Sequence, residues 1–409
     1  MNFSKKRMAA AMAVVFLVPT TSLATNGYFS HGYGVKSSSM GGAGVAHPQD
    51  SMAAATNPAG MVYVGNRVDL GAQLFNPNRE NSHTGGDNTG TTESKNNLFL
   101  IPHVGYNTML DSNTSLGVAV FGNGGMNTSY RRNNDTFGPA NSKLGVDLAQ
   151  LLITPTWARK IDNHAVGVSL VLAAQRFKAS GLENFKPQSI SPTNLTNNGY
   201  DISTGWGIRL GWIGEINDRV SLGVTYATKT YMSEFDDYKG LFAEQGDLDI
   251  PANYAVGIKV KATPKTIVAF DVMRIEYGSV RAIANKIDES VNLGTDDGRG
   301  FGWEDQTVYK LGIEHEYNKT WTFRGGLNYG EMPYDNTQMD FNIISPATVE
   351  THLTLGGTYS PNKENEIDFG YMHAFSNEIT GQGQPAFNLG TITHKMDQNV
   401  FFMNYAWKF

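Results

Sequence analysis

Segments that alternate apolar and polar residues follow one another through most of the chain, with almost no helical pattern between them. The last segment has its large apolar side chains at every second position: Phe401, Met403, Tyr405, Trp407 and Phe409. Period two puts these side chains on one face of a β-strand and the polar ones on the other. The same alternation recurs at 220–226, 254–260, 321–329, 353–359 and 367–371. The pattern predicts an all-β protein.

The apolar face of these strands needs a cover. In a soluble sheet a second protein layer would supply it, but no helices follow the strands. Lipid can cover the face instead, provided that the sheet closes and leaves no unpaired edge. Charges such as Lys259, Arg324 and Asp368 fall on the opposite face, which predicts a polar lumen. Aromatic residues near strand ends fit the girdles at the membrane interfaces: Tyr226, Tyr254, Trp321 and Tyr359.

Turn residues allow the strands to be counted. Short turns are predicted at 111–113, 161–163, 216–218, 262–264, 317–319 and 361–363, where Asn, Asp, Pro and Lys interrupt apolar runs. Long polar connections are predicted at 76–96, 127–145, 179–201, 231–249, 278–302, 331–347 and 377–395. Six turns alternating with seven loops predict a 14-stranded antiparallel transmembrane β-barrel, with the turns on the periplasmic side.

The start of the chain differs from the rest. Residues 1–24 combine a basic stretch, a short apolar run and the small-residue site Ser22-Leu23-Ala24, which predicts a signal peptide. Residues 25–65 are rich in small residues and lack strand alternation. A barrel of 14 strands encloses an open lumen unless something fills it, so we expect this segment to fold inside as a hatch, or plug. A disordered periplasmic tail is the alternative. Residues 66–409 are assigned to the barrel.

Several other function classes find little support. The net charge of −6 gives no sign of a nucleic-acid partner. A hydrolase of the nucleophile-elbow type would need a Gly-x-Ser-x-Gly motif, which is missing. The histidines His164, His352 and His373 are isolated in the sequence, so we expect no metal, no cofactor and no enzyme activity.

The residues before the barrel resemble the N-terminal hatch of the FadL family of outer-membrane transporters. The resemblance rests on Asn57-Pro58-Ala59, preceded by Asp50 and the Gly-rich stretch 41–44, and it extends over the mature chain. It implies a bacterial outer-membrane protein whose ligand is a hydrophobic small molecule. The implied function is uptake of hydrophobic compounds, with long-chain fatty acids favoured, and lateral exit into the membrane. Lipid, lipopolysaccharide and a monomeric state are also implied.

Further residues acquire roles from this resemblance. Phe121, Gly122, Asn123, Gly124 and Gly125 are similar to a kinked strand that forms a lateral opening, and Gly runs favour such a bulge. Arg176 resembles a lumenal basic residue that holds a carboxylate, with Lys178 beside it. In the long loops, Phe137, Leu182 and Phe185 are predicted ligand contacts.

One position departs from the family pattern. Glu304 stands before the tenth strand, where fatty-acid transporters of the family have a basic residue. Two alternatives therefore stay open. One is uptake of neutral aromatic hydrocarbons or alkanes by the same route, and the other is a general diffusion porin.

Overall fold

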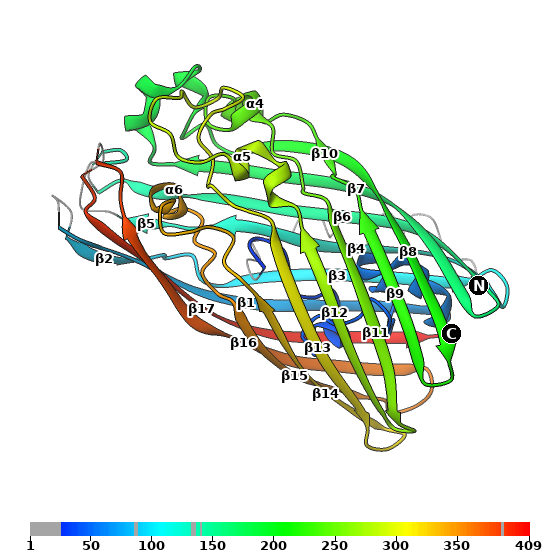
Figure 1. Cartoon of the computed structure of the whole chain (residues 1–409). Coiled ribbons are helices and arrows are strands. Elements are labelled where there is room, and N and C mark those ends of the chain that lie inside the picture. Colours follow the sequence, from blue (N-terminus) through cyan, green and yellow to red (C-terminus); the bar gives the residue numbers. More distant parts are fainter. Residues whose placement is uncertain (1–25, 86–88, 132–135, 140, 386–387) are drawn as a thin grey trace.

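A computed structural model describes residues 26–85, 89–131, 136–139, 141–385 and 388–409. Its main feature is a closed antiparallel barrel (Figure 1). β1 pairs with both β3 and β17, which closes the barrel. The fourteen wall strands are β1 (Arg67–Thr84), β3 (Phe99–Met109), β4 (Thr114–Asn127), β6 (Lys143–Ile161), β7 (His164–Ser180), β8 (Asp201–Asn217), β9 (Val220–Ala227), β11 (Asn253–Thr263), β12 (Thr266–Ile275), β13 (Gln306–Glu316), β14 (Trp321–Gly330), β15 (Thr351–Tyr359), β16 (Asn365–Gln382) and β17 (Thr391–Lys408). The predicted fold is confirmed.

The remaining elements are short. Three small strands extend the wall at the loop end: β2 (Gly90–Glu93), β5 (Tyr130–Arg131) and β10 (Tyr231–Met232). The outer loops contain η2 (Glu183–Gln188), η3 (Pro192–Asn194), η4 (Asp236–Tyr238), α4 (Ala243–Gly246), η5 (Tyr277–Ser279), α5 (Arg281–Ala284) and α6 (Met339–Asn342). None of the described helices combines the length and the apolar character needed to cross a membrane.

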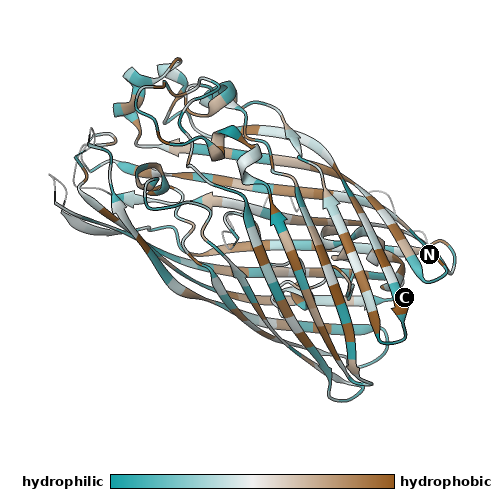
Figure 2. Ribbon diagram, in the orientation of Figure 1, coloured by the Kyte–Doolittle hydropathy of each residue, from teal (hydrophilic) through white to brown (hydrophobic). Residues whose placement is uncertain are grey.

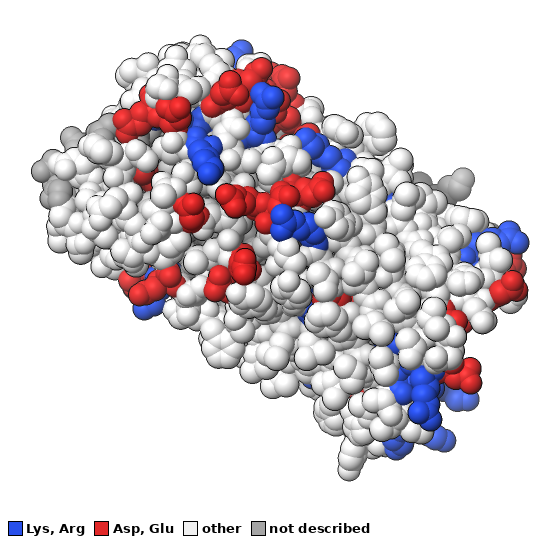
Figure 3. All heavy atoms as spheres, viewed as in Figure 1, with Lys and Arg blue, Asp and Glu red and all other residues white. Residues whose placement is uncertain are grey.

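An apolar belt surrounds the barrel. Large apolar side chains are exposed on the outer face of neighbouring strands, for example Leu170, Leu210, Leu222, Leu311 and Leu355. Figure 2 shows brown residues alternating along the strands, and Figure 3 shows an uncharged zone between charges at the two ends. Aromatic pairs border this zone, with Tyr254 opposite Tyr226 at the loop end and Trp321 opposite Tyr359 at the turn end. Lipid is the solvent that such a belt requires.

The six predicted turns join consecutive wall strands, but several predicted loops are partly strand, two of them over much of their length. β1 continues to Thr84 inside the predicted loop 76–96, and β16 and β17 continue through most of 377–395. These extensions are polar, so apolar alternation could not reveal them. Backbone pairing, as between Glu80 and Lys395, and hydrogen bonds between polar side chains, as between Thr380 and Thr393 at 2.8 Å, hold them.

The segment from Asn26 to Tyr63 lies inside the barrel and contains α2 (Val35–Ser38), α3 (Ala53–Thr56) and η1 (Pro58–Tyr63). We call this segment the plug. It packs directly against wall strands because lumen-facing glycines let the two backbones approach: a Cβ on any of them would collide with plug atoms. These glycines are Gly167, Gly211, Gly223, Gly312, Gly326 and Gly356. The predicted plug inside the lumen is confirmed, while the predicted signal peptide lies outside the described residues.

Buried charges fasten the plug near the turn end of the barrel. The Nζ of Lys36 lies 2.6 Å from a carboxylate oxygen of Glu366 on β16. Glu366 also accepts from Arg67 of β1 at 3.1 Å and from Lys408 of β17 at 2.8 Å. Asp69 accepts a hydrogen bond from the Ser51 backbone at 3.0 Å. Because each buried charge has a partner of opposite sign, the cluster avoids the cost of an unpaired ion and fixes the plug to the wall.

Replacing Gly211 by Val is expected to displace the plug. A Cβ there would collide with the Asn57 side chain and with Pro58, and overpacking of this kind costs about 1–3 kcal/mol. We expect a lower unfolding temperature in detergent and measurable channel conductance in planar bilayers. Gly325→Val is the matched control, because the nearest atom to a Cβ at Gly325 is a Leu355 methyl at 3.5 Å. Equal behaviour of the two variants would contradict the close packing.

Candidate functional site

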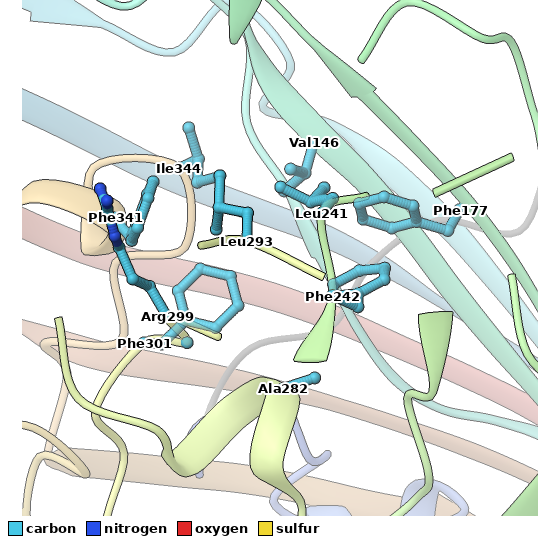
Figure 4. A pocket seen from close by; sticks show the side chains of 11 residues that line it. Val146, Phe177, Leu241, Phe242, Ala282, Leu293, Arg299, Phe301, Phe341 and Ile344 are labelled. Atoms are coloured by element: carbon cyan, nitrogen blue, oxygen red, sulfur yellow. The ribbon is translucent and has the colours of Figure 1, made fainter. Parts of the chain in front are cut away.

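An apolar cavity lies inside the loop end of the barrel, above the plug (Figure 4). It has an empty volume of about 350 Å³, its mouth included. The wall contributes residues from β6 and β7, and the outer loops contribute the others. The lining residues are Val146, Phe177, Leu241, Phe242, Ala282, Leu293, Arg299, Gly300, Phe301, Phe341 and Ile344. Because ten of these eleven are apolar or glycine, the cavity suits a hydrophobic molecule.

Aromatic packing between separate loops holds the cavity together. The ring of Phe177 on β7 lies 4.7 Å from the ring of Phe242, which follows η4. Phe301 packs on Trp303 at a centroid distance of 6.1 Å. Trp303 donates its indole N–H to Asn342 of α6 at 2.7 Å. The first contact joins β7 to the loop of Phe242, and the last joins the loops of Trp303 and Asn342. Periodicity within a single strand cannot predict such contacts.

Arg299 is the charged residue of this lining. It is only 3% exposed, and its Nε and Nη2 donate to the carbonyls of Val291 and Glu289 at 3.3 and 3.1 Å. Its Nη1 is buried and has no hydrogen-bond partner among the described residues. Burial lowers the pKa of the guanidinium, and the nearby Glu289 and Asp288 oppose that shift. The Nη1 of Arg299 is therefore a charged donor at the wall of an apolar cavity, and no described residue accepts a hydrogen bond from it.

The predicted loop contacts lie beside this cavity. Phe137, Leu182 and Phe185 are all buried at the loop end. The rings of Phe137 and Phe185 are 5.6 Å apart, and Phe185 lies 5.3 Å from Phe341 of the lining. Phe137 and Phe185 thus support the cavity wall, and a direct role of any of the three residues in ligand contact stays a prediction.

Arg176 and Lys178 are placed differently from the prediction. Along β7 the even-numbered residues, including the exposed Leu170 and Leu172, face outward, and Arg176 and Lys178 continue that face. Both cations lie over the ring of Tyr200, at 4.8 and 4.4 Å from its centroid. The expected lumenal position of Arg176 is therefore wrong, because period two assigns it to the outer surface. Whether either residue binds ligand there stays a prediction.

Sequence reasoning also missed Arg299. The family resemblance pointed instead to the position of Glu304. This residue is exposed, and its backbone N–H donates to the Pro333 carbonyl at 2.6 Å. The basic residue at the cavity stands five positions earlier in the same connection. Its neighbours Gly298 and Gly300 gave only the signal of an ordinary loop.

The predicted opening lies in β4, where the wall is incomplete. A bulge interrupts the pairing of β4 with β6 between Gly122 and Gly124. On the other side, β4 pairs with β3 from Ser115 to Phe121 and, within the described residues, no further. The edge of β4 from Gly122 to Asn127 is thus left without β3 as a neighbour. We call this part of the wall the β3–β4 gap.

The first residues of the plug cover the gap from the inside. The Ser30 N–H donates to the Asn123 carbonyl at 3.0 Å, and the Gly125 N–H donates to the Tyr28 carbonyl at 3.1 Å. A Cβ on Gly124 would collide with that Tyr28 carbonyl, so the contact requires glycine. The plug therefore takes the place of the missing strand along this edge.

A chain of side-chain amides connects the gap with the outer loops. Tyr33 of the plug donates to Asn123 at 2.7 Å, and Asn123 donates to Gln150 of β6 at 2.9 Å. Gln150 donates to Gln175 of β7, and Gln175 to the Leu248 carbonyl, both at 2.8 Å. All of these groups are largely buried, so movement of one leaves a buried partner unsatisfied.

Asn57-Pro58-Ala59 joins the plug to the far wall. The Asn57 amide donates to the carbonyls of Val45 at 2.8 Å and Trp212 at 3.1 Å, which ties the plug to itself and to β8. Its side-chain oxygen accepts the Ala59 N–H at 3.1 Å and caps η1, which begins with Pro58. The triplet thus acts as an anchor of the plug.

The sequence of this barrel matches that of a known protein family. Residues 21–409 match the family described as "Outer membrane protein transport protein (OMPP1/FadL/TodX)". The chain belongs to this family. It is thus an outer-membrane transport protein. A long-chain fatty acid transport protein of Escherichia coli O6:H1 is 22% identical over 383 residues, covering 81% of both chains. One of Salmonella typhi is 22% identical over 435 residues, covering 92% of this chain and 93% of the relative.

Solved structures of the FadL family share the fold. The Pseudomonas putida toluene transporter TodX superposes with a TM-score of 0.73 at 18% identity, covering 93% of this chain and 99% of that one. A Pseudomonas aeruginosa FadL homologue gives a TM-score of 0.71 at 16% identity, covering 94% and 100%. Among the described residues, no three His, Asp or Glu side chains converge on a point where a metal could bind.

Proposed function

We propose that the chain takes up hydrophobic compounds that carry one acidic group, with long-chain fatty acids as the favoured ligands. The Nη1 of Arg299, which has no hydrogen-bond partner among the described residues, carries this proposal. A charged donor at the wall of an otherwise apolar cavity suits one carboxylate on a long hydrocarbon tail, and such charge-assisted bonds are strong where water is excluded. The two curated relatives named as long-chain fatty acid transport proteins support the same ligand class.

The route begins between the outer loops and ends in the bilayer. Phe301 of the cavity packs on Trp303, and Trp303 lies 6.0 Å from the ring of Tyr28. Tyr28 supplies the carbonyl that covers the β3–β4 gap. A ligand that shifts Phe301 therefore reaches the gap cover through two ring contacts. Withdrawal of Tyr28 to Ser30 opens the gap, and the ligand leaves sideways into lipid.

A neutral hydrocarbon is the second candidate ligand. All lining residues except Arg299 are apolar or glycine, and such a space also accepts an aromatic hydrocarbon or an alkane. The toluene transporters among the similar structures show that the fold is used for such ligands. A general diffusion porin fits less well, because the plug occupies the lumen that polar solutes would need.

The same proposal includes the oligomeric state of the protein and its contacts with the membrane. The protein acts as a monomer, since its closed barrel carries its own cavity and gap. Arg176 and Lys178 stand just beyond the outer apolar residues of β7, at the level where lipopolysaccharide phosphates lie, and we assign them contacts with that layer. No nucleic acid takes part.

Uptake in cells tests the proposal. Cells that lack their own long-chain fatty acid transporter and express this chain should accumulate labelled oleate at least about tenfold faster than vector controls, because the sugar-rich leaflet slows free entry of greasy molecules. Uptake of labelled toluene tests the neutral-hydrocarbon alternative. Single-channel recording tests the general diffusion porin. Oleate uptake equal to the vector control, at normal outer-membrane levels, would rule the proposal out. Large steady conductance would favour the porin.

A further inference from the structure

Three spaces follow one another from the ligand cavity to the outer surface. A second, narrow cavity shares Ile344 with the ligand cavity and extends past Trp303 to Met126 and Arg79. A wider notch, open to the solvent, lies on the other side of Arg79. Arg79 lines both the second cavity and the notch, so it is the side chain that separates the interior from the outside at this point.

Arg79 is a buried cation without a carboxylate partner among the described residues. It is 4% exposed. Its Nη1 and Nη2 donate to the carbonyls of Asn127 and Asn96, and its guanidinium carbon lies 5.8 Å from the centre of the Phe99 ring. Its Nε has no hydrogen-bond partner within the described chain. Carbonyls offset the burial of a cation only in part, so a ligand carboxylate at this position would be bound favourably.

The position of Arg79 matches the boundary of the lipid belt. Along β1 the outward residues change from the exposed Leu70 and Leu74 to the polar Asn78 and Glu80. Arg79 stands at this change, where the outer leaflet passes from hydrocarbon to headgroups. Just below it, Leu98 and Leu100 are 61% and 50% exposed on the outer face. A fatty acid with its carboxylate at Arg79 could thus lay its tail along these leucines in the lipid.

The charges around the notch disfavour escape into water. Three acidic residues, Glu80, Glu93 and Asp397, line it, and besides Arg79 itself the lining contains the cation Lys395. A carboxylate that passed Arg79 toward the notch would meet this net negative charge. The β3–β4 gap, whose edge ends at Asn127 beside Arg79, leads instead to lipid.

We propose that Arg79 is a second carboxylate-binding site, which receives the fatty-acid headgroup after Arg299 and holds it at headgroup level while the tail enters the bilayer. This inference rests on the proposed uptake of fatty acids. Arg79 acts on the departing anion and not on its capture, so it sets the uptake rate of acids without setting their affinity for the ligand cavity.

The test compares oleate with oleyl alcohol, which has the same tail and no charge, in Arg79→Gln. We expect oleate uptake to fall about tenfold, oleyl alcohol uptake to stay level or rise, and equilibrium oleate binding to remain unchanged. Arg79→Lys should restore part of the oleate rate. Asn96→Ala is the matched control: it removes the 3.1 Å side-chain bond to Asn127 but keeps the guanidinium, so it should affect both ligands alike.

Equal changes for both ligands in Arg79→Gln would overturn the proposal, because Arg79 would then only brace the wall. If the wild type transports neither ligand, the proposed function itself fails. If Arg79→Gln does not assemble, a labelling experiment on the wild type tests the proposal instead. A photoreactive fatty acid with its diazirine next to the carboxyl group should label the peptides of Arg79 and Asn127 during uptake. Labelling confined to the ligand cavity would equally overturn the proposal.

Discussion

Oleate is expected to bind about 10- to 100-fold more weakly to Arg299→Gln than to the wild type, because a hydrogen bond to a charged group contributes about 1.5–3 kcal/mol. The Gln amide keeps a donor but loses the charge. The tail contacts, with Phe177 and Phe341 among them, remain in place. Oleyl alcohol should therefore bind both proteins equally. Calorimetry in detergent with both ligands measures the two effects.

Arg281→Gln is the control for this change. Arg281 belongs to α5, next to the lining residue Ala282, but it is half exposed and pairs with Glu244 at 3.6 Å. Its loss should leave oleate binding unchanged. Should Arg299→Gln bind oleate as tightly as the wild type, Arg299 would have no part in ligand recognition. The neutral-hydrocarbon alternative would then be favoured.

The parts of the molecule that could be predicted from the sequence are those in which the alternation of apolar and polar residues shows directly which side chains face lipid. Alternation at Phe401 to Phe409 and at Trp321 to Tyr329 identified lipid-facing strands, since lipid imposes period two on each strand separately. The turns, the closed barrel and the plug followed from the same constraint. Polar strand extensions such as Asn78–Thr84 could not be predicted, because their side chains are polar on both faces of the strand and backbone pairing does not depend on side-chain type.

The site was harder to predict for a different reason. The cavity brings together β6, β7 and three loops, and nothing in any one segment reports the others. Arg176 looked suitable because a basic residue ended an apolar strand, yet its parity with Leu170 and Leu172 already assigned it to the outside. Counting positions along the strand from those leucines would have placed Arg176 on the outer face. No such count is possible for Arg299, because its loop has no regular alternation.

Gly124→Ala is expected to release the plug from the β3–β4 gap. The new Cβ would collide with the Tyr28 carbonyl, which breaks the bond to Gly125 and strains the one between Ser30 and Asn123. Overpacking costs about 1–3 kcal/mol, and about 2 kcal/mol would raise the displaced population roughly 30-fold. The chain has no cysteine, so a single Ser30→Cys reporter can measure this. Ser30 is buried, and its labelling by a water-soluble maleimide should accelerate at least about tenfold, in line with the same population shift.

Gly122→Ala in the same reporter background separates displacement from general damage to β4. A Cβ at Gly122 would meet only the Ile101 side chain at 3.0 Å and the Gln150 carbonyl at 3.9 Å, and neither belongs to the plug. Labelling should stay slow in this variant, and oleate uptake should rise in Gly124→Ala alone. Equal labelling in the two variants would mean that the plug does not hold the gap closed. Faster labelling without faster uptake would mean that the ligand leaves by another path, because an uncovered gap in the lipid belt offers an apolar tail no barrier comparable to water.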